Sequence, residues 1–85
     1  MLRSMQTTAP LQAWTQVHPH LVACVRGERL PGEFVIEKLL FYCSMRTVRE
    51  TLNWAVANEL LDVHFEDIPS SYSLTERGRD WSPNS

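Results

Sequence analysis

The chain has 85 residues and a formal net charge of −2, with 44% hydrophobic and 21% charged residues. This length suits one small domain, and this balance of residues is that of a globular protein rather than a disordered one. The uncharged stretch from Ser4 to Val25 is broken by two prolines and several polar residues, so we expect neither a membrane span nor a signal peptide. The three glycines form no glycine-rich loop, and no nucleophile stands at motif spacing from a base. We therefore expect a cytoplasmic binding protein without catalytic activity, cofactor or metal.

The first predicted element is a helix that begins at Pro10. Apolar and aromatic side chains recur at helical spacing and predict one buried face: Leu11, Trp14, His18, Leu21, Val22 and Val25. Pro19 removes a backbone hydrogen bond and its ring clashes with the preceding turn. We therefore predict two helical pieces or a kink at Pro19, and an end at Gly27.

Two further helices are predicted in the middle of the chain. Residues 30–33 are predicted to form a turn that leads into a short helix over 34–41. Ser44 is a good N-cap, because its hydroxyl can accept from a free backbone N–H of the next turn. The helix from Ser44 to Asn58 has the strongest pattern, with Val48, Leu52, Ala55 and Val56 toward the core and Arg46, Arg49, Glu50 and Asn53 on the opposite face.

After the third helix the period of the apolar residues changes from 3.6 to 2. Residues 61–65 predict a half-buried strand, residues 66–71 a turn, and residues 72–74 the returning strand of a hairpin. Thr75 is predicted to cap a short final helix, and Trp81 to close over the core.

This order of elements predicts an α+β, mainly α fold. Three helices with a helix-turn-helix core are followed by a β-hairpin wing, which is the architecture of a winged helix. We expect a flexible tail over residues 1–9, a single domain over 10–81 and a polar tail over 82–85.

Two segments resemble bacterial DNA-binding families. The turn Leu30-Pro31-Gly32-Glu33 and the segment SMRTVRETL over residues 44–52 resemble the GntR family of repressors. Gly32 stands where that family usually has serine, and about one extra residue lies near 41–43. The segment YSLTERGR over residues 72–79 is similar to the strand-to-helix ending of the MarR and PadR regulators. The resemblance implies a winged helix-turn-helix of bacterial, phage or plasmid type and identifies no subfamily.

The third helix is the candidate recognition helix. If it enters the major groove, its exposed N-terminal side chains reach base edges, and Arg46 can bind guanine through two hydrogen bonds. Ser44 and Thr47 suit a phosphate. We expect a sequence-specific, repressor-like transcriptional regulator that acts by occupying its operator on double-stranded DNA. The candidate DNA-binding residues are Ser44, Met45, Arg46, Thr47, Arg49 and Asn53.

An acidic hairpin favours a second hypothesis. Residues 59–67 contain four acidic residues and neither lysine nor arginine, so DNA phosphates would repel a tip formed by Glu66 and Asp67. The alternative is a protein-interaction module, such as a mobile-element inhibitor of a host complex, that binds through Glu59, Asp62, Glu66 and Asp67. We expect the two tip residues to be exposed, so that exchanging both for lysine hardly changes folding stability.

We expect a homodimer for two reasons. The few basic groups give each monomer only a modest affinity for DNA, and a palindromic operator matches a protein dimer with two-fold symmetry. We expect contacts through the N-terminal helix, with Leu11 and Trp14, or through Trp81. Packing of these side chains within the chain is the alternative. If the helix forms the interface, deleting residues 1–17 leaves a monomer.

Three histidines and two cysteines are candidate metal ligands. His18, His20, Cys24, Cys43 and His64 include ligand types that zinc prefers. These residues lack a Cys-x2-Cys pair and are spread over three predicted elements. We therefore expect no metal, and two reduced thiols that pack as small apolar side chains.

Overall fold

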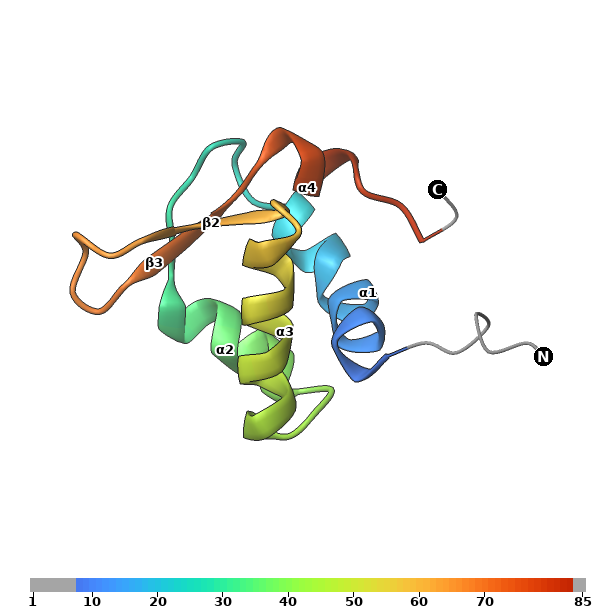
Figure 1. Cartoon of the computed structure of the whole chain (residues 1–85). Coiled ribbons are helices and arrows are strands. Elements are labelled where there is room, and N and C mark those ends of the chain that lie inside the picture. The colour runs from blue at the N-terminus through green and yellow to red at the C-terminus, as the bar shows by residue number, and fades with distance from the viewer. Residues whose placement is uncertain (1–7, 84–85) are drawn as a thin grey trace.

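The computed structural model describes residues 8–83 as four helices and one three-stranded antiparallel sheet (Figure 1). This arrangement confirms a mainly helical α+β fold. In Figure 1 the three longer helices pack beside one another, and the hairpin extends away from them to one side. In chain order, the elements are α1 (Ala9–Val22), β1 (Leu30–Pro31), α2 (Gly32–Leu40), α3 (Met45–Ala57), β2 (Leu61–His64), β3 (Ser71–Leu74) and α4 (Glu76–Asp80).

Helix α1 begins one residue earlier than predicted and continues through Pro19. The Thr8 hydroxyl caps it by accepting from the Leu11 N–H at 3.3 Å. Of the two outcomes predicted at Pro19, the division into two pieces is wrong, since buried Val17 and Leu21 pack on either side of Pro19 and hold the helix against the core. Tertiary packing here outweighs the local cost of proline.

Two predicted boundaries near α1 are wrong. Ala9, assigned to a tail, belongs to α1. The helix ends at Val22, so the predicted end at Gly27 is also wrong. Gly27 lies in the following loop with φ 79°, a backbone conformation that favours glycine. Residues 1–7 and 84–85 of the two predicted tails lie outside the described residues.

The core lies where α1, α2 and α3 meet the first residue of β2. Its largest fully buried side chains are Trp14, Leu21, Leu39, Leu61, Val17, Val35, Val48 and Thr51. The predicted face of α1 is partly wrong: Ala13 and Val17 are buried, whereas Val25 is 73% exposed because it lies beyond the helix end.

Helix α3 follows its prediction closely. Ser44 is the N-cap, and Val48, Leu52 and Ala55 are buried. Thr51 is also buried, which the apolar pattern did not predict. Its hydroxyl donates to the Thr47 carbonyl at 2.7 Å, so its polar group is satisfied within the helix and burial carries little penalty.

The segment Leu30–Pro31, predicted as a turn, forms a short edge strand beside β3, and the sheet order is β1-β3-β2. An edge position tolerates proline because no ladder hydrogen bond is lost on its open side. The next residue, Gly32, donates its N–H to the Ser70 carbonyl at 3.1 Å. A Cβ at Gly32 would lie 2.7 Å from that oxygen. This close approach explains why glycine suits a position where the GntR-like pattern has serine.

The hairpin and the final helix form as predicted, with strand ends shifted by one residue. The Thr75 hydroxyl caps α4 by accepting from the Gly78 N–H at 2.9 Å. Gly78 itself is buried, and its carbonyl lies 2.7 Å from Nε2 of His18. Trp81 packs edge-on against His18, with ring centres 5.0 Å apart, and so closes over the core as predicted.

Candidate nucleic-acid interface

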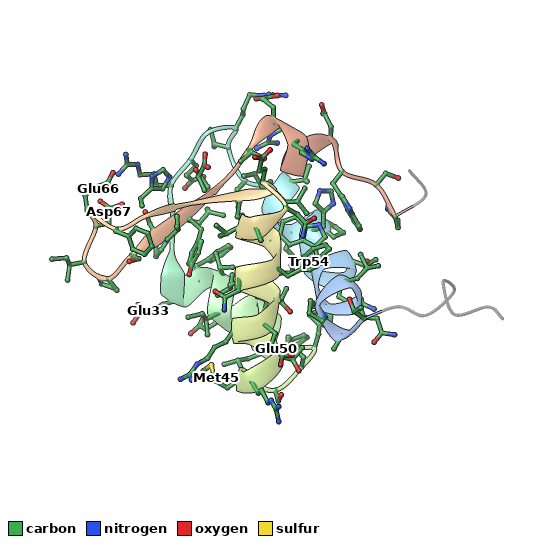
Figure 2. The ribbon with its side chains drawn as sticks, in the orientation of Figure 1. Glu33, Met45, Glu50, Trp54, Glu66 and Asp67 are labelled. Atoms are coloured by element: carbon green, nitrogen blue, oxygen red, sulfur yellow. The ribbon has the colours of Figure 1, made fainter. Side chains whose placement is uncertain are left out.

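The N-terminal half of α3 presents a row of exposed side chains. Ser44 at the helix start accepts from the Thr47 N–H at 3.4 Å. Met45 is 43% exposed, the Arg46 side chain is 89% exposed, and Arg49 is also exposed. Figure 2 shows Met45 at the free end of α3, on the side away from α1, whereas Trp54 lies on the side of α1. This surface is open to a partner.

Helix geometry brings most of the candidate residues together. Met45, Arg49 and Asn53 follow one another at steps of four residues and share one face, with Arg46 beside them. Thr47 falls on the other side of α3, is half-buried, and lines a groove together with α1 residues that include Leu11 and Thr15. The structure therefore places Thr47, which contacts the Ser44 hydroxyl, apart from Met45, Arg49 and Asn53.

The charges on this surface are mixed. Oε2 of Glu50 lies 3.7 Å from Nε of Arg46, a loose pair one helical turn apart. Arg49 forms no ion pair with any other residue in the described part of the chain. Across α2 and α3, residues 32–57 hold three basic and three acidic residues. The surface of α3 therefore has two arginines available to a ligand, whereas the two helices taken together carry no net formal charge.

An exposed apolar cluster beside α3 was not predicted. Leu40 is 42%, Phe41 84% and Tyr42 39% exposed, at the end of α2 and in the turn before α3. The Tyr42 hydroxyl lies 2.9 Å from Nε2 of His20. The sequence carried one signal of this feature, which is the extra residue near 41–43 relative to the GntR-like pattern.

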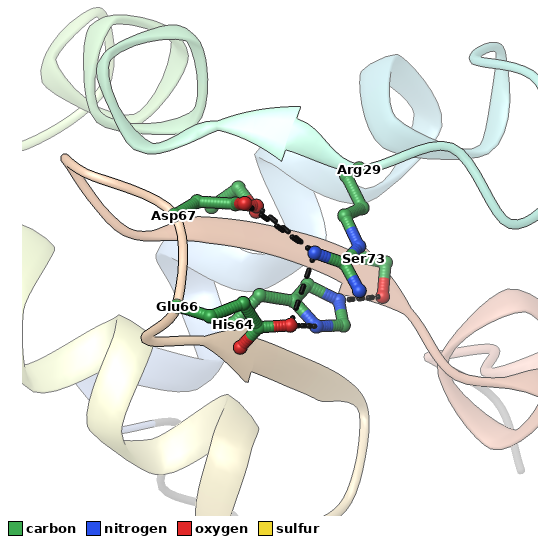
Figure 3. Close-up of polar contacts among 6 residues, drawn as sticks. Arg29, His64, Glu66, Asp67 and Ser73 are labelled. Atoms are coloured by element: carbon green, nitrogen blue, oxygen red, sulfur yellow. Dashed lines mark hydrogen bonds and ion pairs between the residues drawn. The ribbon is translucent and has the colours of Figure 1, made fainter.

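The acidic tip of the hairpin is held by a basic residue from the loop before β1. Nη1 of Arg29 lies 3.0 Å from Oε2 of Glu66 and 3.2 Å from Oδ2 of Asp67 (Figure 3). The Ser71 hydroxyl also donates to Asp67. The Ser71 hydrogen bond, followed by Arg29, lowers the pKa of Asp67 from its usual value. Glu66 is exposed as predicted, whereas Asp67 is half-buried. The expectation that a lysine exchange at both positions hardly changes stability did not include these contacts.

The four acidic residues predicted to bind a protein do not form one continuous acidic surface. Glu59 precedes β2, with a positive φ of 62°, and its carboxylate lies 3.8 Å from Nη1 of Arg77. Asp62 is exposed on β2. Two apolar side chains adjoin the tip instead: Phe65 is 75% exposed and Ile68 is 96% exposed. The hairpin tip is therefore apolar as well as acidic, and Arg29 partly neutralises it.

The tryptophans pack with one another inside the chain. Trp14 is 1% exposed, and its ring centre lies 6.3 Å from that of Trp54 and 6.2 Å from that of Trp81. The expectation that Trp14 contacts a second subunit is wrong, because the alternative of packing within the chain is the one observed.

The histidines and cysteines serve separate local contacts. His64 Nε2 lies 2.8 Å from the Ser73 hydroxyl, and both cysteines are free thiols. Burial raises the pKa of the Cys43 thiol. Within residues 8–83, no three His, Cys, Asp or Glu side chains gather closely enough to hold a metal ion.

None of the helices described is both long enough and apolar enough to cross a membrane. Comparisons of the chain with protein-family models, curated proteins and solved structures find no match.

Proposed function

We propose that the protein is a sequence-specific, double-stranded DNA-binding regulator with a winged-helix fold, in which α3 is the recognition helix and β2–β3 is the wing. The observation that carries this proposal is the row of exposed side chains Met45, Arg46, Arg49 and Asn53 on α3. A helix in the major groove contacts bases through its N-terminal residues, which is where this row lies.

The chemistry of the row suits base edges. An arginine binds O6 and N7 of guanine through two hydrogen bonds, and an asparagine binds N6 and N7 of adenine in the same way. Arg49 is without an ion-pair partner in the described chain, and the Arg46–Glu50 contact at 3.7 Å is loose enough to exchange for a base. The Ser44 end of α3 supplies free backbone N–H groups toward a phosphate.

The Arg29 contacts weaken one objection to this proposal, which is that the acidic hairpin tip would repel DNA phosphates. One guanidinium lies within 3.2 Å of both tip carboxylates, so the repulsion that the wing exerts on phosphates is smaller than two free carboxylates would give. The protein would act by occupying its operator. A homodimer on a palindromic site remains part of the proposal, and its interface does not include buried Trp14.

Selection from a randomised duplex library tests the proposal without knowledge of the operator. Repeated rounds of binding at low salt should enrich one sequence motif, and the enriched duplex should bind at least about a thousandfold more tightly than a scrambled duplex of equal length. Binding that is equal on both duplexes, or no binding at low salt, would contradict the proposal.

A second candidate function is a protein-interaction module that acts through the hairpin tip. The observation that favours it is the exposure of Phe65 and Ile68 beside two carboxylates. Exposed apolar side chains rimmed by charge are typical of protein contacts. The suitable partner has an apolar pocket with basic residues around it.

Ile68→Asp distinguishes the two functions. Ile68 is 96% exposed, so the change should leave folding intact. If the tip docks on a protein, material copurified with the wild type from the native host should be absent with Ile68→Asp and retained with Arg46→Ala. The opposite pattern would contradict docking through the tip.

A further inference from the structure

One apolar side chain lies within the otherwise polar row on α3. Met45 is the first residue of the helix and is 43% exposed. Helical spacing places it one turn before Arg49, and Arg49 one turn before Asn53. The row therefore combines a soft apolar group, two guanidinium groups and a carboxamide on a single surface.

The major groove offers a matching set of groups. Guanine, adenine and cytosine present hydrogen-bond donors and acceptors there, and the C5-methyl of thymine is the one apolar group at a base edge. A thioether side chain is flexible and polarisable, so it can adapt its shape to a methyl group. The presence of Met45 in this row is explained if the bound sequence includes a thymine.

We propose that Met45 is a specificity-determining residue that contacts the methyl group of a thymine in the DNA bound by α3. This inference rests on the proposed function. The thymine lies beside the base pairs that the arginines read, because Met45 is adjacent to Arg46 in the chain and one turn from Arg49 on the helix surface.

Phe41 provides a matched control. It is more exposed than Met45, at 84%, but its ring packs edge-on against Tyr42, with centres 5.7 Å apart. Phe41 lines a groove with His20 and Lys38, from α1 and α2, to which Met45 does not contribute. Removing the Phe41 ring thus deletes exposed apolar area outside the row on α3.

The test uses the duplex enriched from the randomised library. Each thymine is replaced in turn by deoxyuridine, which lacks only the C5-methyl. At one thymine position the wild type should bind the deoxyuridine duplex about fourfold more weakly, the factor expected for losing one buried methyl group. Met45→Ala should bind the thymine duplex more weakly by a similar factor and bind both duplexes equally. Phe41→Ala should keep the full preference for thymine.

A second variant and a folding check make the result decisive. Met45→Gln keeps the length of the side chain and replaces the thioether with an amide, so it should also lose the preference for thymine. Thermal melting followed by circular dichroism verifies that each variant is folded. Equal binding of the wild type to every deoxyuridine duplex, or an unchanged preference in both Met45 variants, would overturn the inference while DNA binding stands. Failure of the library to enrich any motif would instead contradict DNA binding itself, and the inference with it.

Discussion

The guanidinium of Arg29 lies 3.2 Å from Oδ2 of Asp67, 38 residues further along the chain. Arg29 comes from the loop between α1 and β1, and Asp67 from the tip of the hairpin. Their contact links the loop before β1 to the loop between β2 and β3.

Exchanging the tip carboxylate tests this contact. Asp67→Lys should destabilise the fold, because it places a cation against Arg29 and removes the acceptor of the Ser71 hydroxyl. Arg29→Ala should act in the same direction by a smaller amount, since Ser71 still binds Asp67. Urea unfolding measures both. Asp62→Lys, also a charge reversal on the hairpin but at an exposed position, is the control and should change the midpoint less than either variant.

The dependence of stability on pH follows from two carboxylates. The pKa of Asp67 is lowered from its usual 3.8, first by the Ser71 hydrogen bond, and that of Glu76 from its usual 4.5, first by its hydrogen bond to Arg26. A carboxylate with a lowered folded-state pKa stabilises the fold above its unfolded-state pKa, and this stabilisation is lost as the pH falls through the folded-state pKa. The free energy of unfolding should therefore fall on going from about pH 5 to pH 3.

Neutral variants of the same two residues check the cause of this pH dependence. Asp67→Asn and Glu76→Gln should each flatten the fall in stability between pH 5 and pH 3, and the double variant should flatten it further. Curves parallel to that of the wild type would show that other carboxylates govern acid unfolding.

The backbone at Gly78 leaves no room for a side chain. A Cβ added there would lie 2.0 Å from the Leu60 carbonyl oxygen, so the backbone of α4 or of the segment before β2 must shift. Gly78→Ala should lower the free energy of unfolding by about 1–3 kcal/mol or more. Arg77→Ala, at the exposed neighbouring position, should stay within about 0.5 kcal/mol. Equal midpoints of urea unfolding for the two variants would refute this account of Gly78.

Helix α1 is part of the core, so deleting it tests folding rather than dimerisation. Trp14→Ala should cost about 3–5 kcal/mol, as expected for emptying a buried aromatic site. Deleting residues 1–17 removes Ala13, Trp14 and Val17 from the core, so it should unfold the chain rather than produce a folded monomer. Circular dichroism of the truncated protein distinguishes these outcomes, because a native-like spectrum with a cooperative melt would contradict the structural role of α1.

Local signals predicted most of the elements and the exposed row on α3. Ser44 and Thr75 are capping residues with strong positional preference, and the spacing of Val48, Leu52 and Ala55 defines one face of a helix. These features depend on residues that are close in sequence. Because the core residues occupy one face of α3, the exposure of Arg46, Arg49 and Asn53 on the opposite face could be predicted.

The remaining features depend on contacts between distant segments. The strand Leu30–Pro31 exists because β3 lies beside it, and a two-residue strand has no periodicity to detect. The pairing of Arg29 with the hairpin tip joins an isolated arginine to residues 37 and 38 positions away. The burial of Trp14 against Trp54 and Trp81 likewise requires the packed helices, so composition alone could not separate it from a subunit contact.

The oligomeric state is open to a direct measurement. A two-fold operator calls for a dimer, so light scattering of the free protein should give about twice the 9.8 kDa of the chain, and the complex should contain two chains per duplex. A single chain on the enriched duplex at saturation would contradict a palindromic operator and leave recognition to one copy of α3.

Sequence-specific recognition by α3 is tested by the affinity of the wild type and of Arg46→Ala for the enriched duplex and for a scrambled duplex at the same salt concentration. Fluorescence anisotropy at two salt concentrations separates base contacts from phosphate contacts. Arg46→Ala should lose about 1–3 kcal/mol of binding free energy on the enriched duplex, a factor of about 5 to 150, with a smaller loss on the scrambled duplex and relaxed preference at one base pair. A wild type that binds the two duplexes equally, or binds neither at low salt, would contradict sequence-specific recognition by α3.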